Sequence, residues 1–241
     1  MNVNEIVRIV PTLKVNNRKL NERFYIEILG MKPLLEESAF ISLGDQTATE
    51  RLILEEAPSM RTRKVEGLKK LARLLIKVEN PSEIEALLSQ MKSLPRLFKG
   101  SRGYAFEIVS PEEDVILVHA ENDIRDLVPL ETVPEFYSNT SIKYVSQFEV
   151  SMELRLPEGT ESLLDPEGVA PAITFTKGQG PDLAVENNVT WDLTMLKFLV
   201  RNFDLTSLRQ KFEKTGYFVP KSEKFFLGKD TNNIELWFEE A

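Results

Sequence analysis

The chain has 241 residues, of which 42% are hydrophobic and 28% are charged, and its formal net charge is −8. These values are typical of a globular protein that is long enough for two domains. The acidic balance argues against a nucleic-acid binder, and against adhesion to anionic lipid, because both functions need clustered lysine and arginine. The absence of cysteine excludes disulfides, thiolate metal sites and a cysteine nucleophile.

Two kinds of targeting segment are not apparent in the sequence. No apolar run approaches the ~18 residues that a transmembrane helix needs. The first ten residues lack the basic-then-apolar order of a signal peptide. We therefore expect a cytoplasmic location and no membrane partner.

Residues 5–58 predict a first module of one strand, one helix and three further strands. Leu13 and Val15 lie on one face of the first strand, and Phe24 and Ile28 have the spacing of one helix face. Gly30 fits the position after a helix, where a positive φ is inexpensive for glycine. The three strands that follow are expected over residues 32–37, 39–43 and 51–55.

The same order of elements returns from Leu71 onward, after a basic stretch that we interpret as a crossing loop. A strand, a helix opened by Asn80 or Ser82, and three more strands are expected, over residues 72–78, 82–91, 97–99, 103–109 and 115–121. This weak internal repeat favours two fused modules that form one curved sheet, a cup. We assign residues 1–124 to this domain and residues 125–144 to a linker.

Residues 145–241 predict a smaller second domain. Residues 149–156 alternate between apolar and polar side chains, as in a half-buried strand. Asp204 is a good N-cap for a helix over residues 205–215, which Gly216 closes. The remaining expected elements are a turn at 165–168, a strand at 172–176 and a closing hairpin at 224–227 and 233–238.

The opening strand, helix and glycine turn resemble the βαβββ module of the glyoxalase-like (vicinal-oxygen-chelate) family. The resemblance implies an α+β fold of paired modules, with a C-terminal domain that partly resembles the same fold, and a metal held in the cup of the sheet. The family's ligand positions would fall at Val10, Arg73 and Leu117, and near Ile53 with a slip toward Glu55 allowed. Apolar and cationic side chains do not coordinate metals, so we expect no metal and no cofactor.

Two polar residues of the predicted cup are candidates for ligand binding. Arg73 either anchors an anionic ligand or pairs with a nearby carboxylate. His119 is the only histidine and lies on the same strand face as Leu117. It is either a general base at the rim of the cup or a polar residue at a strand end near Asn122.

The second domain offers four further candidates. Glu235 occupies an expected ligand position, and its first-strand counterpart is Lys197, so a Lys197–Glu235 ion pair is the simplest prediction. Glu149 and Glu153 lie on one polar strand face. They either join Glu235 in an oxygen-only site for Mg²⁺ or Ca²⁺, or form a solvated face.

Taken whole, and especially in residues 229–237, the chain resembles the CppA family, a streptococcal family described as C3-degrading proteinases. The resemblance implies a link to complement C3 and exposure at the cell surface or outside the cell. The sequence lacks the His-Glu-x-x-His, Asp-Thr-Gly and Gly-x-Ser-x-Gly motifs of common peptidases. A Ser–Lys or Ser–His site stays open, so whether the protein is an enzyme is undecided.

Three functions follow from these observations. The first is a metal-free protein that binds a small molecule or a peptide in the cup. The second is degradation of complement C3, directly or through another protease. The third is a metal-dependent glyoxalase or dioxygenase. The exposed sheet edges of such a fold would also allow a homodimer.

Overall fold

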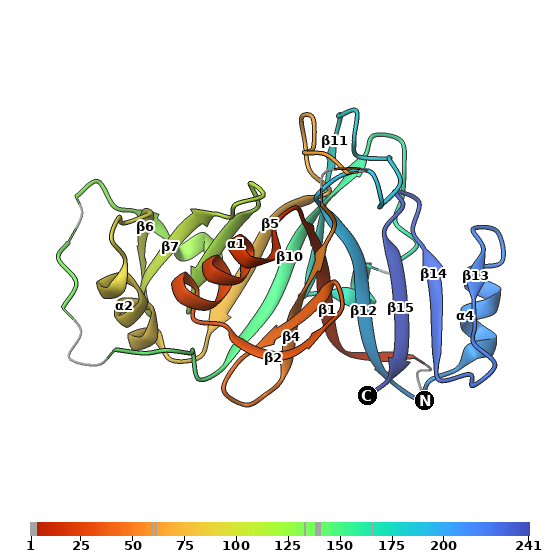
Figure 1. Cartoon of the computed structure of the whole chain (residues 1–241), viewed down its shortest axis with the longest axis horizontal. Helices are drawn as coiled ribbons and strands as arrows, with labels where there is room; N and C mark the ends of the chain where they lie inside the picture. Colours follow the sequence, from red (N-terminus) through yellow and green to blue (C-terminus); the bar gives the residue numbers. More distant parts are fainter. Residues whose placement is uncertain (1–3, 59, 61, 133, 138–140, 165) are drawn as a thin grey trace.

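The computed structural model describes residues 4–58, 60, 62–132, 134–137, 141–164 and 166–241. Their strands form two sheets, which lie side by side in Figure 1. The strand order is β13-β14-β15-β12-β1-β4-β3-β2 in the eight-stranded sheet and β11-β10-β5-β8-β7-β6-β9 in the seven-stranded sheet.

The first module has the predicted order of elements. It comprises β1 (Glu5–Val15), α1 (Arg18–Arg23), the π-helix η1 (Phe24–Ile28), β2 (Lys32–Glu37), β3 (Phe40–Gly44) and β4 (Glu50–Glu56). Asn17 caps α1, since its side chain accepts a hydrogen bond from the backbone N–H of Leu20. Gly30 follows the helix with φ of 67°, which confirms its predicted role.

The second module repeats this order and also extends into the predicted linker. Its elements are β5 (Leu71–Val78), α2 (Pro81–Gln90), β6 (Arg96–Gly100), β7 (Gly103–Val109) and β8 (Val115–His119). Asn80 caps α2, with Pro81 in the first turn. The 3₁₀ helix η2 (Ile124–Asp126) and the short strand β9 (Val128–Pro129) follow, and β9 pairs with β6.

The C-terminal part contains a short third module and a complete fourth one. The third has only β10 (Phe148–Pro157), the single-turn α3 (Pro166–Val169) and β11 (Ile173–Gly178). The fourth has β12 (Leu193–Arg201), α4 (Leu205–Lys211), β13 (Tyr217–Phe218), β14 (Phe225–Lys229) and β15 (Glu235–Glu240). Asp204 caps α4 as predicted, and β14 with β15 forms the predicted hairpin.

The modules combine in a different way from the one predicted. The first strand of module one, β1, pairs antiparallel with β12 of module four, and β5 of module two pairs antiparallel with β10 of module three. The prediction that modules one and two form one sheet is therefore wrong. The opening strands of modules one and two, β1 and β5, each have one edge that their own module leaves unpaired. The C-terminal strands β12 and β10 pair with these two edges.

One apolar core lies between the two sheets. Leu13 and Leu54 contribute to it from one sheet, and Ile76 and Met152 contribute from the other. Strand β10 contacts both β1 and β4 across this core. The side chains that alternate with these core residues lie on the opposite face of each sheet, which we call its outer face. None of the described helices has the length and apolar character that a membrane crossing requires.

Candidate functional site

The outer face of the eight-stranded sheet has a partly apolar floor where modules one and four meet. Val10 on β1 lies directly opposite Lys197 on β12 in the antiparallel ladder. Thr12 lies between Ile53 of β4 and Met195 of β12. Val10 and Thr12 are fully buried. This part of the face therefore joins strands from both ends of the chain.

A cavity of about 390 Å³ opens on this outer face, which is within the range of small-molecule sites. Strands β2, β3, β4 and β12 supply its walls, so it too spans modules one and four. It is lined by Leu35, Glu37, Ser38, Phe40, Ser42, Glu50, Ile53 and Met195. Phe40 is 43% exposed and Leu35 is 61% exposed, so two large apolar side chains face solvent at its mouth.

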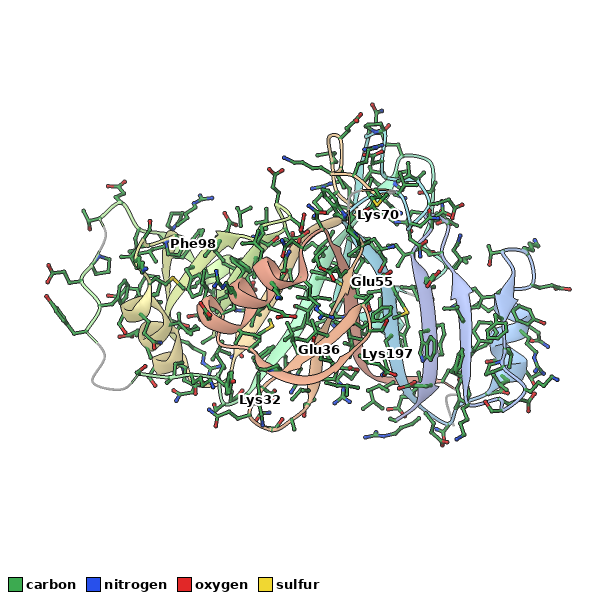
Figure 2. All side chains as sticks on the ribbon, in the orientation of Figure 1. Lys32, Glu36, Glu55, Lys70, Phe98 and Lys197 are labelled. Atoms are coloured by element: carbon green, nitrogen blue, oxygen red, sulfur yellow. The ribbon has the colours of Figure 1, made fainter. Side chains whose placement is uncertain are left out.

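Lys197 joins the two modules through a pair of carboxylates. Its Nζ lies 3.1 Å from Glu50 Oε2 and 3.0 Å from Glu239 Oε1. Burial opposes the charge of this amine, but the hydrogen bonds and charges of Glu239 and Glu50 outweigh it, so the pKa of Lys197 is raised. Figure 2 shows Lys197 on β12, in the middle of the eight-stranded sheet.

The predicted Lys197–Glu235 ion pair is therefore wrong. Strand β15 runs parallel to β12, and Glu235 lies opposite Met195 rather than Lys197. Glu239 is four residues further along the same face of β15, and it carries the partner carboxylate. It also accepts a hydrogen bond of 2.8 Å from Trp237 Nε1, which fixes its position.

The donor set on this face does not fit the metal that the glyoxalase-like fold implies. Val10 and Ile53 have no lone pairs to offer, and the ammonium of Lys197 repels a cation. Glu50 and Glu239 are both engaged by that ammonium. Lys14 in turn lies 3.4 Å from the carboxylate of Glu55, the alternative ligand position.

The other two predicted ligand positions lie on the second sheet, not in the same cup. Arg73 of β5 and Glu153 of β10 are direct cross-strand neighbours. Their side chains form a bidentate pair, with Nη2–Oε1 at 2.6 Å and Nε–Oε2 at 3.2 Å. Leu117 lies on the adjacent strand β8. Of the two roles considered for Arg73, the structure shows pairing with a carboxylate.

His119 ends β8 on the same outer face and is buried, with 4% exposure. Burial, together with the nearby charge of Lys77, lowers the pKa of His119 to about 4. Its Nδ1 has no hydrogen-bond partner among the described residues. A buried imidazole that stays neutral near pH 7 and has no acidic or hydroxyl partner at Nδ1 lacks the geometry of a catalytic dyad.

The oxygen-only site proposed for Mg²⁺ or Ca²⁺ does not assemble. Glu149 and Glu153 lie on β10 in the seven-stranded sheet, whereas Glu235 lies on β15 in the eight-stranded sheet. No cluster of three or more metal-binding side chains occurs among the described residues. Glu153 is instead the partner of Arg73.

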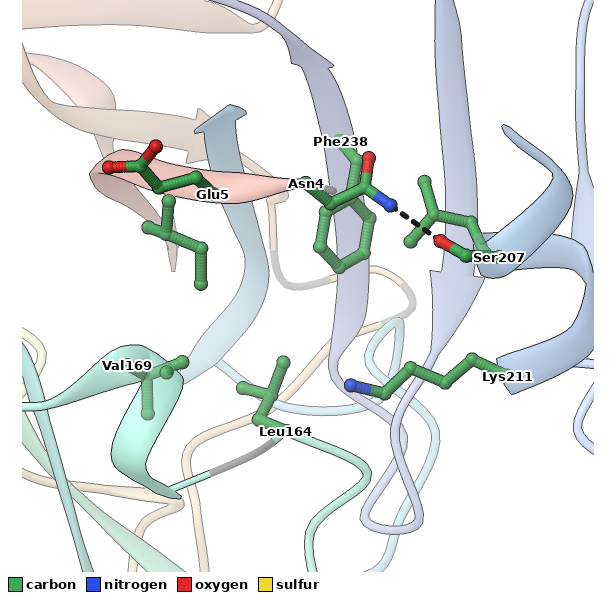
Figure 3. Close-up of a pocket in the computed structure, with 10 residues that line it drawn as sticks. Asn4, Glu5, Leu164, Val169, Ser207, Lys211 and Phe238 are labelled. Carbon is green, nitrogen blue, oxygen red and sulfur yellow. Dashed lines mark hydrogen bonds between the residues drawn. The ribbon is translucent and has the colours of Figure 1, made fainter. Parts of the chain in front are cut away.

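A second, larger cavity of about 530 Å³ lies where α3, α4 and the start of β1 meet. Figure 3 shows Leu164, Val169 and Phe238 in its walls and Lys211 at its side. Asn4 donates a hydrogen bond of 2.8 Å to Ser207 at its rim. We interpret this space as a consequence of the single-turn α3, which has four residues, whereas α2, the helix of module two, has ten.

Comparison with known proteins now identifies the family. The family model described as CppA N-terminal matches residues 8–130, and the model described as CppA C-terminal matches residues 145–238. The chain belongs to the CppA family. The crystal structure of the CppA protein from Streptococcus pneumoniae TIGR4 is 66% identical, with full coverage of both chains and a TM-score of 0.95.

The fold of this CppA-family chain is shared with more distant structures. A glyoxalase I mutant from Zea mays is 11% identical, with a TM-score of 0.55, and the alignment covers 97% of this chain and 93% of that one. This likeness confirms the predicted glyoxalase-like fold of paired modules and carries no argument about activity. No curated protein matches the chain significantly.

Sequence reasoning missed most residues of the cavity. Leu35, Phe40, Ser42 and Met195 were not singled out, and neither were the carboxylates Glu50 and Glu239. The period-two pattern of the third and fourth strands contained part of the signal, because Ser42 and Ile53 share a face as register neighbours. The cavity is completed by Met195 of the partner module, so its position depends on how the modules pair. Local sequence patterns do not reveal this pairing.

Proposed function

We propose that this CppA-family protein is a metal-independent binding protein, and that its ligand is a small organic molecule held on the outer face of the eight-stranded sheet. The observation that carries the proposal is the cavity of about 390 Å³ beside the Lys197 network. Four of its lining residues are apolar, and the others are hydroxyls or carboxylates. This mixture is typical of sites that bury an apolar body and orient it with a few polar groups.

Lys197 supports the proposal in a second way. Its ammonium draws Glu50 of module one and Glu239 of module four toward one point, which holds the walls of the cavity together. A site that is fixed before its ligand arrives loses less free energy to ordering when the ligand binds. The network is therefore a positioning device and not a catalytic centre.

A ligand screen with a blocked variant tests the proposal. Small-molecule mixtures are added to ¹⁵N-labelled protein, and binding is located by shifts of the amides in β2–β4 and β12. Met195→Trp, which fills the cavity, should abolish binding. Val109→Trp is the matched control, because Val109 is an exposed residue of β7 in the other sheet. Binding that survives Met195→Trp, or that maps only to other surfaces, contradicts the proposal.

Degradation of complement C3, which the family resemblance implies, is not part of this proposal. The imidazole of His119 is buried and neutral near pH 7, which gives a Ser–His site no support. Incubation of purified protein with C3 tests that activity directly. Cleavage that persists in His119→Gln and in lysine variants would point to a contaminating protease.

A further inference from the structure

Among the described residues, those that line the cavity on the outer face of the eight-stranded sheet and carry charge are both acidic. Glu37 lies at its mouth on β2, and Glu50 lies deeper on β4. Two nearby cations are engaged with carboxylates: Lys197 lies between Glu50 and Glu239, and Arg51 donates to Asp45. The groups that a ligand would meet in the cavity therefore carry negative charge.

The wider surroundings do not cancel this charge. Arg8 on β1 adds one positive charge that acts on Glu50 and lies beside Arg51. The Arg51–Asp45 and Lys14–Glu55 pairs are each neutral, so the cations Arg8 and Lys197 are set against the carboxylates Glu37, Glu50 and Glu239. The acidic excess remains, and it is concentrated at the residues that line the cavity.

Glu50 keeps room for another hydrogen-bond donor. Ser42 Oγ donates to its Oε1 at 2.5 Å, and Lys197 Nζ donates to its Oε2 at 3.1 Å. An ionised carboxylate has about four lone-pair sites, so these two bonds leave about half of its capacity unused. The same two bonds hold the carboxylate in one orientation at the cavity wall.

The apolar walls match the body of an organic cation. Phe40 is 43% exposed, so part of its ring is open to a ligand. A cation over an aromatic face is attracted by the ring quadrupole. Ile53 and Met195 form the inner side of the cavity, and methionine adapts to irregular apolar shapes.

We infer that the ligand of this cavity is an organic amine in its ammonium form, with an aromatic or compact aliphatic body. The inference rests on the proposed function and adds the chemical class of the ligand. The ammonium group hydrogen-bonds to Glu50, Glu37 adds its charge at the mouth, and the body packs against Phe40, Leu35 and Met195.

Three probes of similar size but different charge test the inference. The probes are 2-phenylethylamine, 2-phenylethanol and 3-phenylpropionate, each titrated into ¹⁵N-labelled protein at pH 7. We expect the amine to bind at least about tenfold more tightly than the alcohol, because a charge-assisted hydrogen bond adds about 1.5–3 kcal/mol. The carboxylate should bind most weakly, because it meets like charge.

Two variants test whether the preference for the amine probe arises in this cavity. Glu50→Gln should weaken the amine about tenfold and leave the alcohol nearly unchanged. Phe40→Leu, at a half-exposed position on a strand near the sheet edge, should weaken the amine about threefold without unfolding the protein. Glu107→Gln is the matched control, because Glu107 is a carboxylate on the outer face of the other sheet. Glu107→Gln should leave the affinity for all three probes unchanged.

The outcomes separate the two proposals. Equal binding of the three probes, a preference for the carboxylate, or shifts away from β2–β4 would overturn the amine inference. If none of the probes binds but the wider screen finds other ligands in the cavity, the inference fails and the proposed function stands. If neither the probes nor the screen place a ligand in the cavity, both fail.

Discussion

The two sheets differ in how they neutralise a partly buried cation at their central strand pairs, β5–β10 and β1–β12. In the seven-stranded sheet Arg73 faces Glu153 directly across the ladder, so the cation is neutralised by its own neighbour. In the eight-stranded sheet Lys197 faces Val10, which offers no charge, so its partners come from β4 and β15. Both arrangements join two modules. The Arg73 pair is set by direct cross-strand register, with Glu107 of β7 as a more distant partner at 4.0 Å, whereas the Lys197 network frames a cavity.

Removal of Lys197 should therefore have the largest effect on stability. In Lys197→Met, Glu50 and Glu239 lose their shared cation while about three quarters buried. Breaking a buried ion pair costs about 3–5 kcal/mol, and partial solvent access places this variant near the lower end, at about 3 kcal/mol. Urea denaturation at pH 7 measures the loss of unfolding free energy.

A second substitution shows whether the loss comes from unpaired charge. The double variant Lys197→Met with Glu239→Gln should recover a large part of the stability, because one of the two carboxylates is then neutral. If the double variant is no more stable than Lys197→Met, the stabilisation comes from packing of the lysine stem instead.

The next largest expected effect is the pH dependence of stability that His119 causes. This residue lies on the outer face of the seven-stranded sheet. Its pKa of about 4 lies below the 6.5 of an unfolded histidine, so the unfolded chain binds the proton first as pH falls. The stabilisation by neutral His119 is complete above pH 6.5, and it is lost progressively as the pH falls toward about 4. Between pH 7 and pH 5 this group should cost about 2 kcal/mol of unfolding free energy.

His119→Gln isolates that contribution. Denaturation curves of both proteins at pH 7 and pH 5 measure the difference, and the carboxylates that also titrate in this range cancel in the comparison. The variant should lose about 2 kcal/mol less than the parent protein between the two pH values. Parallel losses would show that His119 accepts a proton as easily in the folded state as in the unfolded state.

The Arg73–Glu153 pair should contribute less than the Lys197 network. Both side chains are about one quarter exposed, so water screens their attraction, although the bidentate geometry favours it. A double-mutant cycle with Arg73→Met and Glu153→Gln should give a coupling energy of about 1 kcal/mol. A coupling as large as that between Lys197 and Glu239 would remove the contrast between the two sheets.

Much of the local structure follows from the sequence. The helix caps Asn80 and Asp204, and the alternation along β10, are short-range signals, and each is confirmed. The resemblance to βαβββ modules likewise indicates the glyoxalase-like fold. These features depend on residues within about one element of each other in the chain.

The site depends on pairings that local patterns do not encode. Nothing in the alternation of β1 or β12 indicates that Val10 lies opposite Lys197, which is 187 residues away. The choice between Glu235 and Glu239 depends on the register of β12 with β15. An irregularity in β4 adds a further shift, because pairing moves from Leu52 to Glu50 with one residue between them.

The smallest expected effect on stability is that of Thr12→Val. This substitution tests whether the hydroxyl of Thr12, on the outer face of the eight-stranded sheet, stabilises the fold. Thr12 is fully buried between Ile53 and Met195, and its Oγ1 has no hydrogen-bond partner among the described residues. A buried hydroxyl without a partner costs about 1–3 kcal/mol of desolvation. Thr12→Val keeps the shape and removes that cost, so the unfolding free energy should stay equal or rise by about 1 kcal/mol. A loss of more than about 1 kcal/mol would show that the hydroxyl is satisfied, for example by bound water, and that the floor is wetter than its apolar neighbours indicate.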